Sequence, residues 1–428
     1  MAMTLVQKVM SAHLGGQPVE PGEVVMLPCD VVLGNDVSTG GAIRALRDMG
    51  IDQVFDPAKI VTVADHFAPA KDVPSAILLQ TLERWAARQG VKFYAQGRGG
   101  IEHTVLIEDG WVRPGTVIGG GDSHTCTYGA LGAFGTGLGF TDLACAMALG
   151  AFWQAVPHTI RVTFTGIRQP FVTGKDMILA VLEQVGVGGA TGCVLEFTGP
   201  GAEALSIDER MAVSNMAVET GAETGFFPAD ETTRAYLDGR TDKPWFPQRS
   251  DPDARFVREV HIDLDALGPL IAMPHLPGNV AQLHEARGRK VDQVYIGNCA
   301  NGTMTDLRQA AEVLRGRRVH DGTRMIIVPA SRRVYKQALD EGLFDIFIDA
   351  GAVVSAPTCG ACFGGHNGVL APGERAVATT NRNFKGRMGS GDAEVYLANA
   401  WTAAAAGVAG EIVDPRDFAD AALQEATQ

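Results

Sequence analysis

The sequence predicts an α/β protein built from parallel or mixed sheets that helices cover. Short apolar runs rich in β-branched residues alternate with helical patterns along most of the 428 residues, as repeated βα units do. Polar clusters follow several of these runs directly, where loops leave the carboxyl ends of strands and ligands gather in open α/β sheets. The chain is too long for one ordinary core, so we expect several domains.

Seven apolar runs are predicted strands, and five stretches with helical spacing are predicted helices. The predicted strands are residues 24–33, 60–64, 117–121, 159–165, 293–296, 325–329 and 346–349. The predicted helices are residues 38–49, 75–88, 141–153, 305–314 and 393–407. Prolines and glycines near residues 157 and 269–279 interrupt the pattern. They predict three α/β domains, at residues 1–157, 158–275 and 276–428.

Composition and charge narrow the class of partner. Hydrophobic residues make up 46% of the chain and charged residues 20%, as in ordinary soluble proteins, so disorder is disfavoured. The net charge of −13 argues against nucleic-acid and anionic-membrane surfaces, which need clustered lysine and arginine. No signal-like or membrane-spanning apolar run stands out, which predicts a cytoplasmic protein. We therefore expect a small molecule or another protein as partner.

Three of the seven cysteines are candidate metal ligands. Cys299 follows the predicted strand 293–296, and Cys359 and Cys362 form a CxxC pair. Three thiolates suit a cubane iron–sulfur cluster whose fourth iron keeps an open position for Lewis-acid catalysis. The CxxC pair alone also fits a thioredoxin-like dithiol or half of a zinc site, with only His366 near. We interpret Cys29, Cys145 and Cys193 as small buried apolar residues and, with less support, Cys126.

One polar loop follows the predicted strand 117–121 and holds Asp122, Ser123 and His124. A carboxylate, a hydroxyl and an imidazole can together bind an oxyanion or relay a proton. The same trio also fits an ordinary turn or a fragment of a Ser-His-Asp nucleophilic site. The glycine string 132–139 that follows lacks the context of a dinucleotide-binding fingerprint, so we interpret it as close backbone packing.

Two further acidic–imidazole pairs are Asp65-His66, after the strand 60–64, and Glu102-His103. A carboxylate beside an imidazole can tune its pKa. Neighbouring residues of a strand point to opposite faces, so a working Asp65-His66 pair needs loop geometry. A lone histidine is more often structural than catalytic, and the sequence alone leaves both interpretations open.

Two arginines, Arg382 and Arg387, lie in a glycine-containing segment after the strand-like residues 376–378. Paired guanidinium groups are well shaped for bidentate recognition of a dicarboxylate. A solvated surface turn is the alternative interpretation of this segment.

Together these segments resemble the aconitase and isopropylmalate dehydratase family, from Thr4 to about Pro415. The motifs that match in the family's order are Asp65-His66, Asp122-Ser123-His124-Thr125, Cys299-Ala300-Asn301-Gly302, the Cys359–Cys362 pair and Asn381-Arg382-Asn383-Phe384-Lys385-Gly386-Arg387. The family's Asn-Met-x-x-Glu pattern is matched by Asn215-Met216-Ala217-Val218-Glu219. Each motif is weak or moderate alone, but five in order make coincidence improbable.

The resemblance implies three α/β/α domains of the aconitase type around a central cluster site, without the family's swivelling fourth domain. It implies that Cys299, Cys359 and Cys362 hold one 4Fe-4S cluster per subunit, with the open iron binding substrate oxygens. The residues it implies in catalysis are Asp65, His66, His103, Asp122, Ser123, His124 and Glu219. Those it implies near the cluster are Asn215, Asn301 and Asn381, and Arg382 and Arg387 match arginines that serve carboxylates.

The activity that the resemblance implies is reversible dehydration and rehydration of a branched malate, a hydroxy di- or tricarboxylate. Interconversion of 2- and 3-isopropylmalate in leucine synthesis is our first choice, with homoaconitate, citramalate and 2,3-dimethylmalate as alternatives. Because this chain lacks the extension that encodes the family's catalytic serine, we expect a small partner subunit that carries the swivelling domain and that serine. From other classes, a CxxC oxidoreductase and an iron-sensing or RNA-binding relative remain as weaker alternatives.

The chain departs from the family pattern at three positions. Asn298 and Ala300 flank Cys299, where relatives commonly have a serine and a threonine, and Asn35 stands where glutamine or histidine is usual. We expect Asn35 to bind substrate, and these departures to affect which hydroxy acid is accepted. They leave the three cysteines intact.

Overall fold

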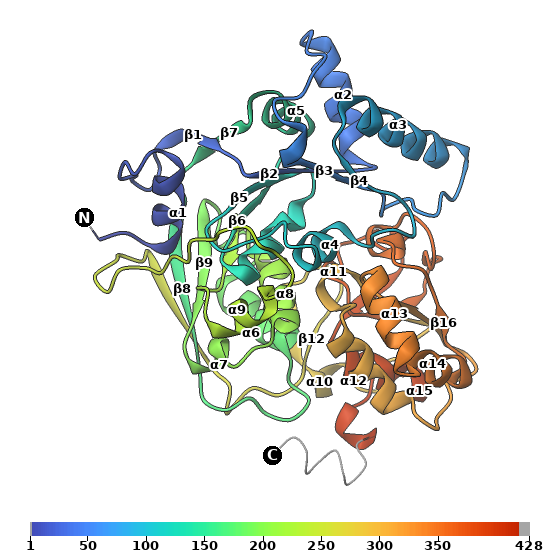
Figure 1. The fold of residues 1–428 in the computed structure, drawn as a ribbon. Coiled ribbons are helices and arrows are strands. Elements are labelled where there is room, and N and C mark those ends of the chain that lie inside the picture. The colour runs from blue at the N-terminus through green and yellow to red at the C-terminus, as the bar shows by residue number, and fades with distance from the viewer. Residues whose placement is uncertain (1, 419–428) are drawn as a thin grey trace. The chain divides into compact units, whose positions relative to one another are not determined.

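A computed structural model describes residues 2–418 of the chain (Figure 1). Contacts divide the chain into two compact units. Unit 1 comprises Met1–Thr163 and Gly188–His261, and unit 2 comprises Phe164–Val187 and Ile262–Gln428. Helices alternate with mostly parallel strands in both units, which confirms the α/β class. The three-domain boundaries stay a prediction.

Unit 1 is built on a five-stranded parallel sheet in the order β4-β3-β2-β5-β6. Its central strand, β2 (Val31–Asn35), is buried at every residue, as expected for a parallel strand with both faces covered. The other strands of unit 1 are β1 (Val24–Pro28), β3 (Ile60–Val63), β4 (Lys92–Tyr94), β5 (Val117–Gly120), β6 (Phe134–Gly137), β7 (Ala151–Ala155), β9 (Cys193–Thr198) and β10 (Gly225–Phe226). Strands β1 and β7 form an antiparallel pair.

A second sheet of unit 1 has the order β10-β9-β8-β11, and the chain passes between the units within two of its strands, β8 (His158–Thr165) and β11 (Arg258–Asp263). The helices of unit 1 are α1 (Leu5–His13), α2 (Ser38–Asp48), η1 (Pro57–Lys59), α3 (Val73–Gln89), α4 (Glu102–Glu108), η2 (Ser123–Leu131), α5 (Phe140–Leu149), α7 (Pro200–Glu203), α8 (Ile207–Asn215), η3 (Met216–Thr220) and α9 (Glu231–Leu237). Two apolar clusters, one on each face of the parallel sheet, form its core.

Unit 2 is built on a seven-stranded sheet in the order β13-β12-β18-β17-β14-β15-β16. The five strands from β18 to β16 are parallel, and β12 and β13 are antiparallel. The strands are β12 (Leu270–Ala272), β13 (Val280–Gln282), β14 (Gln293–Gly297), β15 (Arg324–Val328), β16 (Val353–Val354), β17 (Arg375–Ala378) and β18 (Glu394–Leu397). An apolar cluster packs these strands against helices.

The helices of unit 2 are α6 (Gly174–Val185), α10 (Leu283–Ala286), α11 (Asn298–Asn301), α12 (Met304–Leu314), α13 (Arg332–Asp340), α14 (Leu343–Ala350), η4 (Gly360–Phe363), α15 (Ala400–Ala409) and η5 (Pro415–Phe418). Capping boxes begin three of them. Thr173 and Asp176 cap α6, Gln282 and Glu285 cap α10, and Thr303 and Asp306 cap α12. These boxes satisfy backbone donors that a helix N-terminus leaves free.

Two of the predicted elements are wrong in type. Residues 346–349 were predicted as a strand but belong to α14, where Phe347 is buried and Ile348 exposed, so the apolar run covers one helical face. Residues 393–407 were predicted as one helix but hold β18 and then α15. The side chain of Asn399 caps α15 at Thr402, which places the helix start well inside the alanine-rich stretch.

Two further predicted elements are each split by a short break. The run 24–33 forms β1 and β2, because Cys29 and Asp30 interrupt it. The stretch 141–153 forms α5 and β7, separated by the left-handed Gly150. Within residues 2–418, no helix combines the length and the apolar character that a bilayer span requires.

Candidate active site

The parallel sheet of unit 1 gathers the predicted polar loops at one edge. β2 comes first in the chain, β3 and β4 lie to one side of it, and β5 and β6 lie to the other. Asn35 ends β2, Asp65 and His66 follow β3, and Asp122 follows β5. The strand order therefore reverses between β2 and β5, which is where open α/β sheets bind ligands.

Asp36 organises the loop that carries Asp65 and His66. Its fully buried carboxylate accepts the backbone N–H of Asp65 at 3.1 Å and of His66 at 3.0 Å through Oδ1, and that of Phe67 at 2.7 Å through Oδ2. The chain after β3 is thereby turned so that the adjacent Asp65 and His66 side chains meet. The sequence reasoning did not select Asp36, although it stands next to Asn35 after a buried strand.

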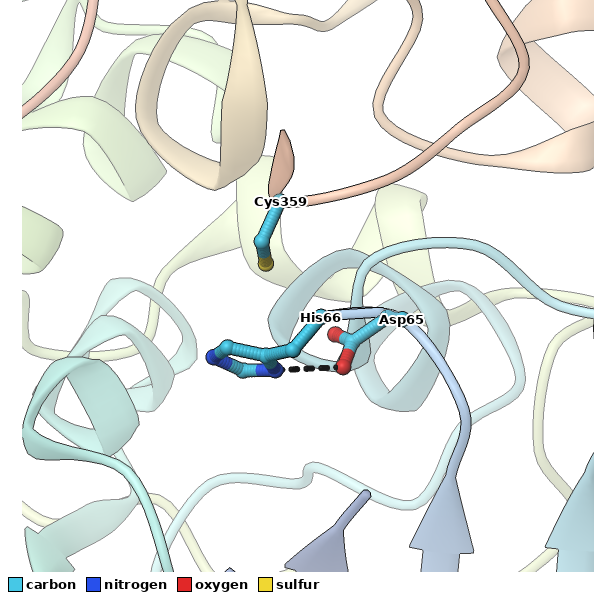
Figure 2. Close-up of side chains that lie close together, drawn as sticks. All are labelled: Asp65, His66 and Cys359. Atoms are coloured by element: carbon cyan, nitrogen blue, oxygen red, sulfur yellow. Dashed lines mark hydrogen bonds and ion pairs between the residues drawn. The ribbon is translucent and has the colours of Figure 1, made fainter. Parts of the chain in front are cut away.

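His66 lies among carboxylates. Figure 2 shows its Nδ1 bonded to Asp65 Oδ1, at 2.7 Å, and its Nε2 is 3.7 Å from Asp122 Oδ2. Burial lowers the pKa of His66, but Asp65 and Asp122 outweigh burial and hold that pKa well above its usual range. These carboxylates therefore favour the positively charged form of the imidazole, and Asp65 fixes the orientation of its ring.

Glu102 is a buried carboxyl group in the same cluster. Its Oε1 accepts a hydrogen bond from Asn35 Nδ2 at 3.0 Å, and its Oε2 has no hydrogen-bond partner among residues 2–418. Burial, with the charges of Asp65 and Asp122, raises the pKa of Glu102 well above its usual range. Glu102 is thus a candidate proton carrier. Asn35 also accepts backbone N–H groups at the start of α2, so part of its role is structural.

A chain of alternating imidazoles and carboxylates runs through His103, Asp122, His124 and Glu219. His103 Nε2 lies 3.1 Å from Asp122 Oδ1, His124 Nδ1 lies 3.3 Å from the same oxygen, and His124 Nε2 lies 3.0 Å from Glu219 Oε1. Burial would raise the pKa of Asp122, but hydrogen bonds from His103, His124 and His66 hold it well below its usual range. This chain can hold and relay protons.

The remaining predicted residues of unit 1 are Ser123 and Asn215. Ser123 begins η2, and its hydroxyl makes no hydrogen bond with residues 2–418. Asn215 ends α8, and its Nδ2 donates to Thr127 Oγ1 at 2.8 Å, within the η2 segment. The glycine string is confirmed as close packing, because a Cβ on Gly135 would lie 2.3 Å from the Thr125 carbonyl oxygen.

The sheet of unit 2 brings the predicted cysteine and arginine segments to its own carboxyl edge. Cys299 follows β14, the Cys359–Cys362 pair follows β16, and Asn381 follows β17. The strand order reverses between β14 and β17. A Cβ on Gly297, the last residue of β14, would lie 2.3 Å from the Val328 carbonyl oxygen, so glycine is needed where the Cys299 loop begins.

Two amide side chains contact the thiols. Asn298 adopts a φ of 85° and donates through Nδ2 to Cys362 Sγ at 3.1 Å. Asn381 Nδ2 donates to Cys299 Sγ at 3.6 Å, while its Oδ1 accepts from Cys362 Sγ at 3.5 Å. Cys299 and Cys362 are buried and Cys359 is partly exposed. The amide group of Asn381 thus contacts two of the three predicted ligands, Cys299 and Cys362.

Lys175 is a buried cation close to this group of thiols. Its Nζ donates to the carbonyl oxygens of Thr379 at 2.9 Å and Thr380 at 2.7 Å, which precede Asn381 in the chain. Burial lowers the pKa of Lys175 to about 8, although the charges of Asp306, Cys362 and Cys299 act in the opposite direction. No sequence signal pointed to Lys175, because it lies in the first turn of α6.

Tyr295 of β14 was not selected from the sequence either, since an aromatic residue in a strand usually belongs to the hydrophobic core. Its side chain is fully buried, and its hydroxyl has no hydrogen-bond partner among residues 2–418. A Cβ built on Gly360, between Cys359 and Cys362, would lie 3.4 Å from that hydroxyl oxygen. The phenol therefore reaches the CxxC segment.

The two predicted arginines differ in their surroundings. Arg387 Nε donates to the Cys362 carbonyl oxygen at 2.8 Å, and its terminal nitrogens have no hydrogen-bond partner among residues 2–418. Arg382 is half-buried beside Asn381.

Asn301 donates through Nδ2 to Asp306 Oδ1 at 2.9 Å, so it fixes the start of α12. All seven cysteines are free thiols.

Comparison with known proteins places these motifs in a family. The sequence model of the aconitase family (aconitate hydratase) matches residues 7–410. A 3-isopropylmalate dehydratase large subunit 2 of Rubrobacter xylanophilus is 64% identical over 97% of this chain and 98% of its own length. The 3-isopropylmalate dehydratase large subunit of Moorella thermoacetica is 49% identical over 97% of this chain and 99% of its own length.

The fold is similar to that of one solved structure with low sequence identity. Aconitase X of Thermococcus kodakaraensis has a TM-score of 0.51 at 12% identity, over 89% of each chain. At that identity the similarity concerns the fold alone. The match to the family's sequence model and the near full-length relatives carry the assignment, and on these grounds the chain belongs to the aconitase family.

Proposed function

We propose that this chain is the large subunit of a hydro-lyase that interconverts 2- and 3-isopropylmalate, a step of leucine synthesis. The observation that carries the proposal is the set of three thiols at the carboxyl edge of the unit 2 sheet, with amide donors on two of them. Relatives named 3-isopropylmalate dehydratase large subunit, similar over nearly the whole chain, support the choice of substrate.

The residues of unit 2 fit a 4Fe-4S cluster. Cys299, Cys359 and Cys362 would hold three irons, and the fourth would have no protein thiolate. Asn298 and Asn381 already donate to two of the thiols, and the unpartnered hydroxyl of Tyr295 is a further donor beside the CxxC segment. When bound, such a cluster supplies a Lewis acid for the substrate's hydroxyl and carboxylate groups.

The charged groups of unit 1 are proposed to handle protons. Dehydration of a hydroxy acid requires a proton for the departing hydroxyl group, and hydration requires that proton to be taken back. His103 would carry it, because Asp122 lies 3.1 Å from its Nε2 and keeps its ring oriented. His124 is held in turn by Glu219. Asp65 and His66 would set the electrostatic charge around these histidines. The Ser123 hydroxyl would be available to bind substrate oxygens.

Arginines of unit 2 are proposed to bind the substrate's carboxylates. Arg387 is oriented by its Nε bond to the Cys362 carbonyl, which leaves its terminal nitrogens available for a carboxylate. Arg382 would serve a second carboxylate. Asn35 is a weaker candidate for substrate binding, because Glu102 and the start of α2 already occupy its side chain.

The partner of this chain is proposed to be a small subunit that carries a swivelling domain with the catalytic serine. The words "large subunit" in the names of its relatives support a second subunit. A complex of the two would work in the cytoplasm, as the substrate's place in amino-acid synthesis suggests.

The proposed activity can be tested on the assembled complex. We would co-express the chain with its small subunit, reconstitute it with iron and sulfide without oxygen, and follow formation of the unsaturated acid from 2- and 3-isopropylmalate. Homoaconitate, citramalate and 2,3-dimethylmalate serve as competing substrates. Turnover of one of these and not of isopropylmalate would contradict the proposed substrate, and absence of iron uptake would contradict the proposed cluster.

A further inference from the structure

The hydroxyl of Tyr295 is a buried polar group with nothing in the described chain to bond to. The side chain lies in β14, the middle one of the five parallel strands of the unit 2 sheet, and is 0% exposed. Its Oη has no hydrogen-bond partner among residues 2–418. Buried hydroxyls nearly always have a partner, and leaving one without is destabilising. A phenylalanine would fill the same space without that cost.

The position of the hydroxyl indicates where its partner would lie. A Cβ on Gly360 would be 3.4 Å from Tyr295 Oη, and Gly360 stands between Cys359 and Cys362. The backbone at Tyr295 is fixed, because the Thr379 N–H donates to the Tyr295 carbonyl oxygen at 3.0 Å. The phenol is therefore held against the segment that carries two of the three thiols.

The charge around the phenol keeps its proton in place. Burial, and then the thiolate charges of Cys362, Cys359 and Cys299, raise the pKa of Tyr295 well above its usual range. A phenol that stays protonated beside electron-rich sulfur is a hydrogen-bond donor. Asn298 differs, since its amide already donates to Cys362 Sγ within the chain.

We propose that the Tyr295 hydroxyl donates a hydrogen bond to a sulfur of the cluster and protects the cluster against oxidative loss of iron. This inference rests on the cluster proposed above. A hydrogen bond to sulfur stabilises the more electron-rich state and so raises the reduction potential. Oxidation then becomes harder. In that oxidation one electron passes to an oxidant such as ferricyanide or dioxygen, one Fe²⁺ leaves, and [4Fe-4S]²⁺ becomes [3Fe-4S]⁺.

The test compares the reconstituted complex with its Tyr295→Phe and Tyr396→Phe variants. Tyr396 is the matched control, because it is a buried tyrosine of the same sheet whose hydroxyl bonds to Arg289 and Glu394. Iron and sulfide content is measured first. The rise of the three-iron paramagnetic signal after ferricyanide, and the potential of the cluster, are then followed in each protein.

We expect Tyr295→Phe to bind the same amount of iron and sulfide but to lose its fourth iron about three to ten times faster, as loss of one ordinary hydrogen bond predicts. Its potential should fall, and Tyr396→Phe should match the parent. The cluster-free Tyr295→Phe chain should melt no lower than the parent, because the substitution removes an unpaired hydroxyl.

Two results would overturn the inference in different ways. If Tyr295→Phe binds a full cluster with the parent's potential and rate of iron loss, the hydrogen bond does not exist and the proposed function stands. If the parent and both variants bind no iron and sulfide under any reconstitution condition, the proposed cluster fails, and this inference fails with it.

Discussion

The two units of this chain contain parallel sheets of the same strand order with opposite chemistry at their edges. In unit 1 the order is β4-β3-β2-β5-β6, and in unit 2 the corresponding strands run β16-β15-β14-β17-β18. In each set of five strands, the first along the chain is central, the next two lie to one side and the last two to the other. No sequence repeat was evident, so topology is what the two sheets share.

The difference lies in which groups follow the central strand. In unit 1 the loops after β2, β3 and β5 carry carboxylates and imidazoles, which are hydrogen-bonded into a connected set. In unit 2 the loops after β14, β16 and β17 carry thiols, amides and arginines. The same topology thus supports proton chemistry at the edge of one sheet and soft-metal binding at the corresponding edge of the other. The side chains that follow the strands determine which of the two occurs.

The largest expected effect is at the thiols of unit 2. Replacing Cys362 with serine should abolish stable cluster binding and all turnover, because a neutral hydroxyl is a poor substitute for a thiolate on iron. Replacing Cys193, a partly exposed thiol of unit 1, is the matched control and should leave both unchanged. Iron and sulfide analysis with paramagnetic resonance checks this. A Cys362→Ser variant with a full, stable cluster would remove the thiols of unit 2 from the proposal.

The corresponding change in unit 1 should damage the reaction without affecting the cluster. His103→Asn is expected to reduce kcat by roughly 10²- to 10⁴-fold, the usual contribution of a general acid or base. Iron content should remain that of the parent. His13 provides the control, since its Nε2 lies 2.8 Å from Asp30, which precedes β2, whereas the polar loops follow the carboxyl ends of the strands. Equal losses of kcat in His103→Asn and His13→Asn would mean that the effect is structural.

Much of this arrangement could be predicted from the sequence, because the strand-end clusters are local. Asp65, Asp122 and Cys299 each follow a short apolar run, and the rule that ligands gather at the carboxyl ends of parallel strands placed them correctly. Type errors arose where an apolar run is equally compatible with strand and helix. Residues 346–349 are such a run, and their membership of α14 depends on packing beyond the segment.

The groups that were missed act over long distances in the sequence. Lys175 contacts carbonyl groups 204 and 205 residues away, and nothing in its own segment indicates this. Tyr295 resembles a core aromatic until the lack of a partner for its hydroxyl is seen. Asp36 bonds to backbone N–H groups about 30 residues further on, and such contacts have no residue-type signature. Tertiary pairing of this kind is what one sequence leaves open.

A smaller effect is expected at the buried cation of unit 2. Lys175→Met should lower the free energy of unfolding by about 2 to 4 kcal/mol, because two buried carbonyl groups lose their donor. Part of the cost is offset, since a buried charge is removed as well. The exposed Lys336, paired with Asp340 on α13, is the control and should change stability by less than about 1 kcal/mol. Denaturant titration of each variant measures both, and a fully stable Lys175→Met would show that the carbonyls find other donors.

The smallest expected effect is a pH-dependent change in stability at His66, in the charged edge of unit 1. The pKa of His66 is raised in the folded chain, so the stabilisation it provides is fully present below its unfolded value near 6.5 and is lost as pH rises through the folded value. We expect His66→Asn to lower the free energy of unfolding at pH 6, because the variant lacks the stabilisation that the raised pKa of His66 provides. The cost should shrink as pH rises toward 9.

Thermal or denaturant unfolding of the parent and His66→Asn between pH 6 and 9 gives this difference directly. The exposed His158 of β8 is the control, and its replacement should give a curve parallel to the parent's. A difference between the parent and His66→Asn that grows with pH would mean that the imidazole is held neutral. The carboxylates of Asp65 and Asp122 would then have to carry the missing protons, and the charge assignment of the unit 1 edge would be reversed.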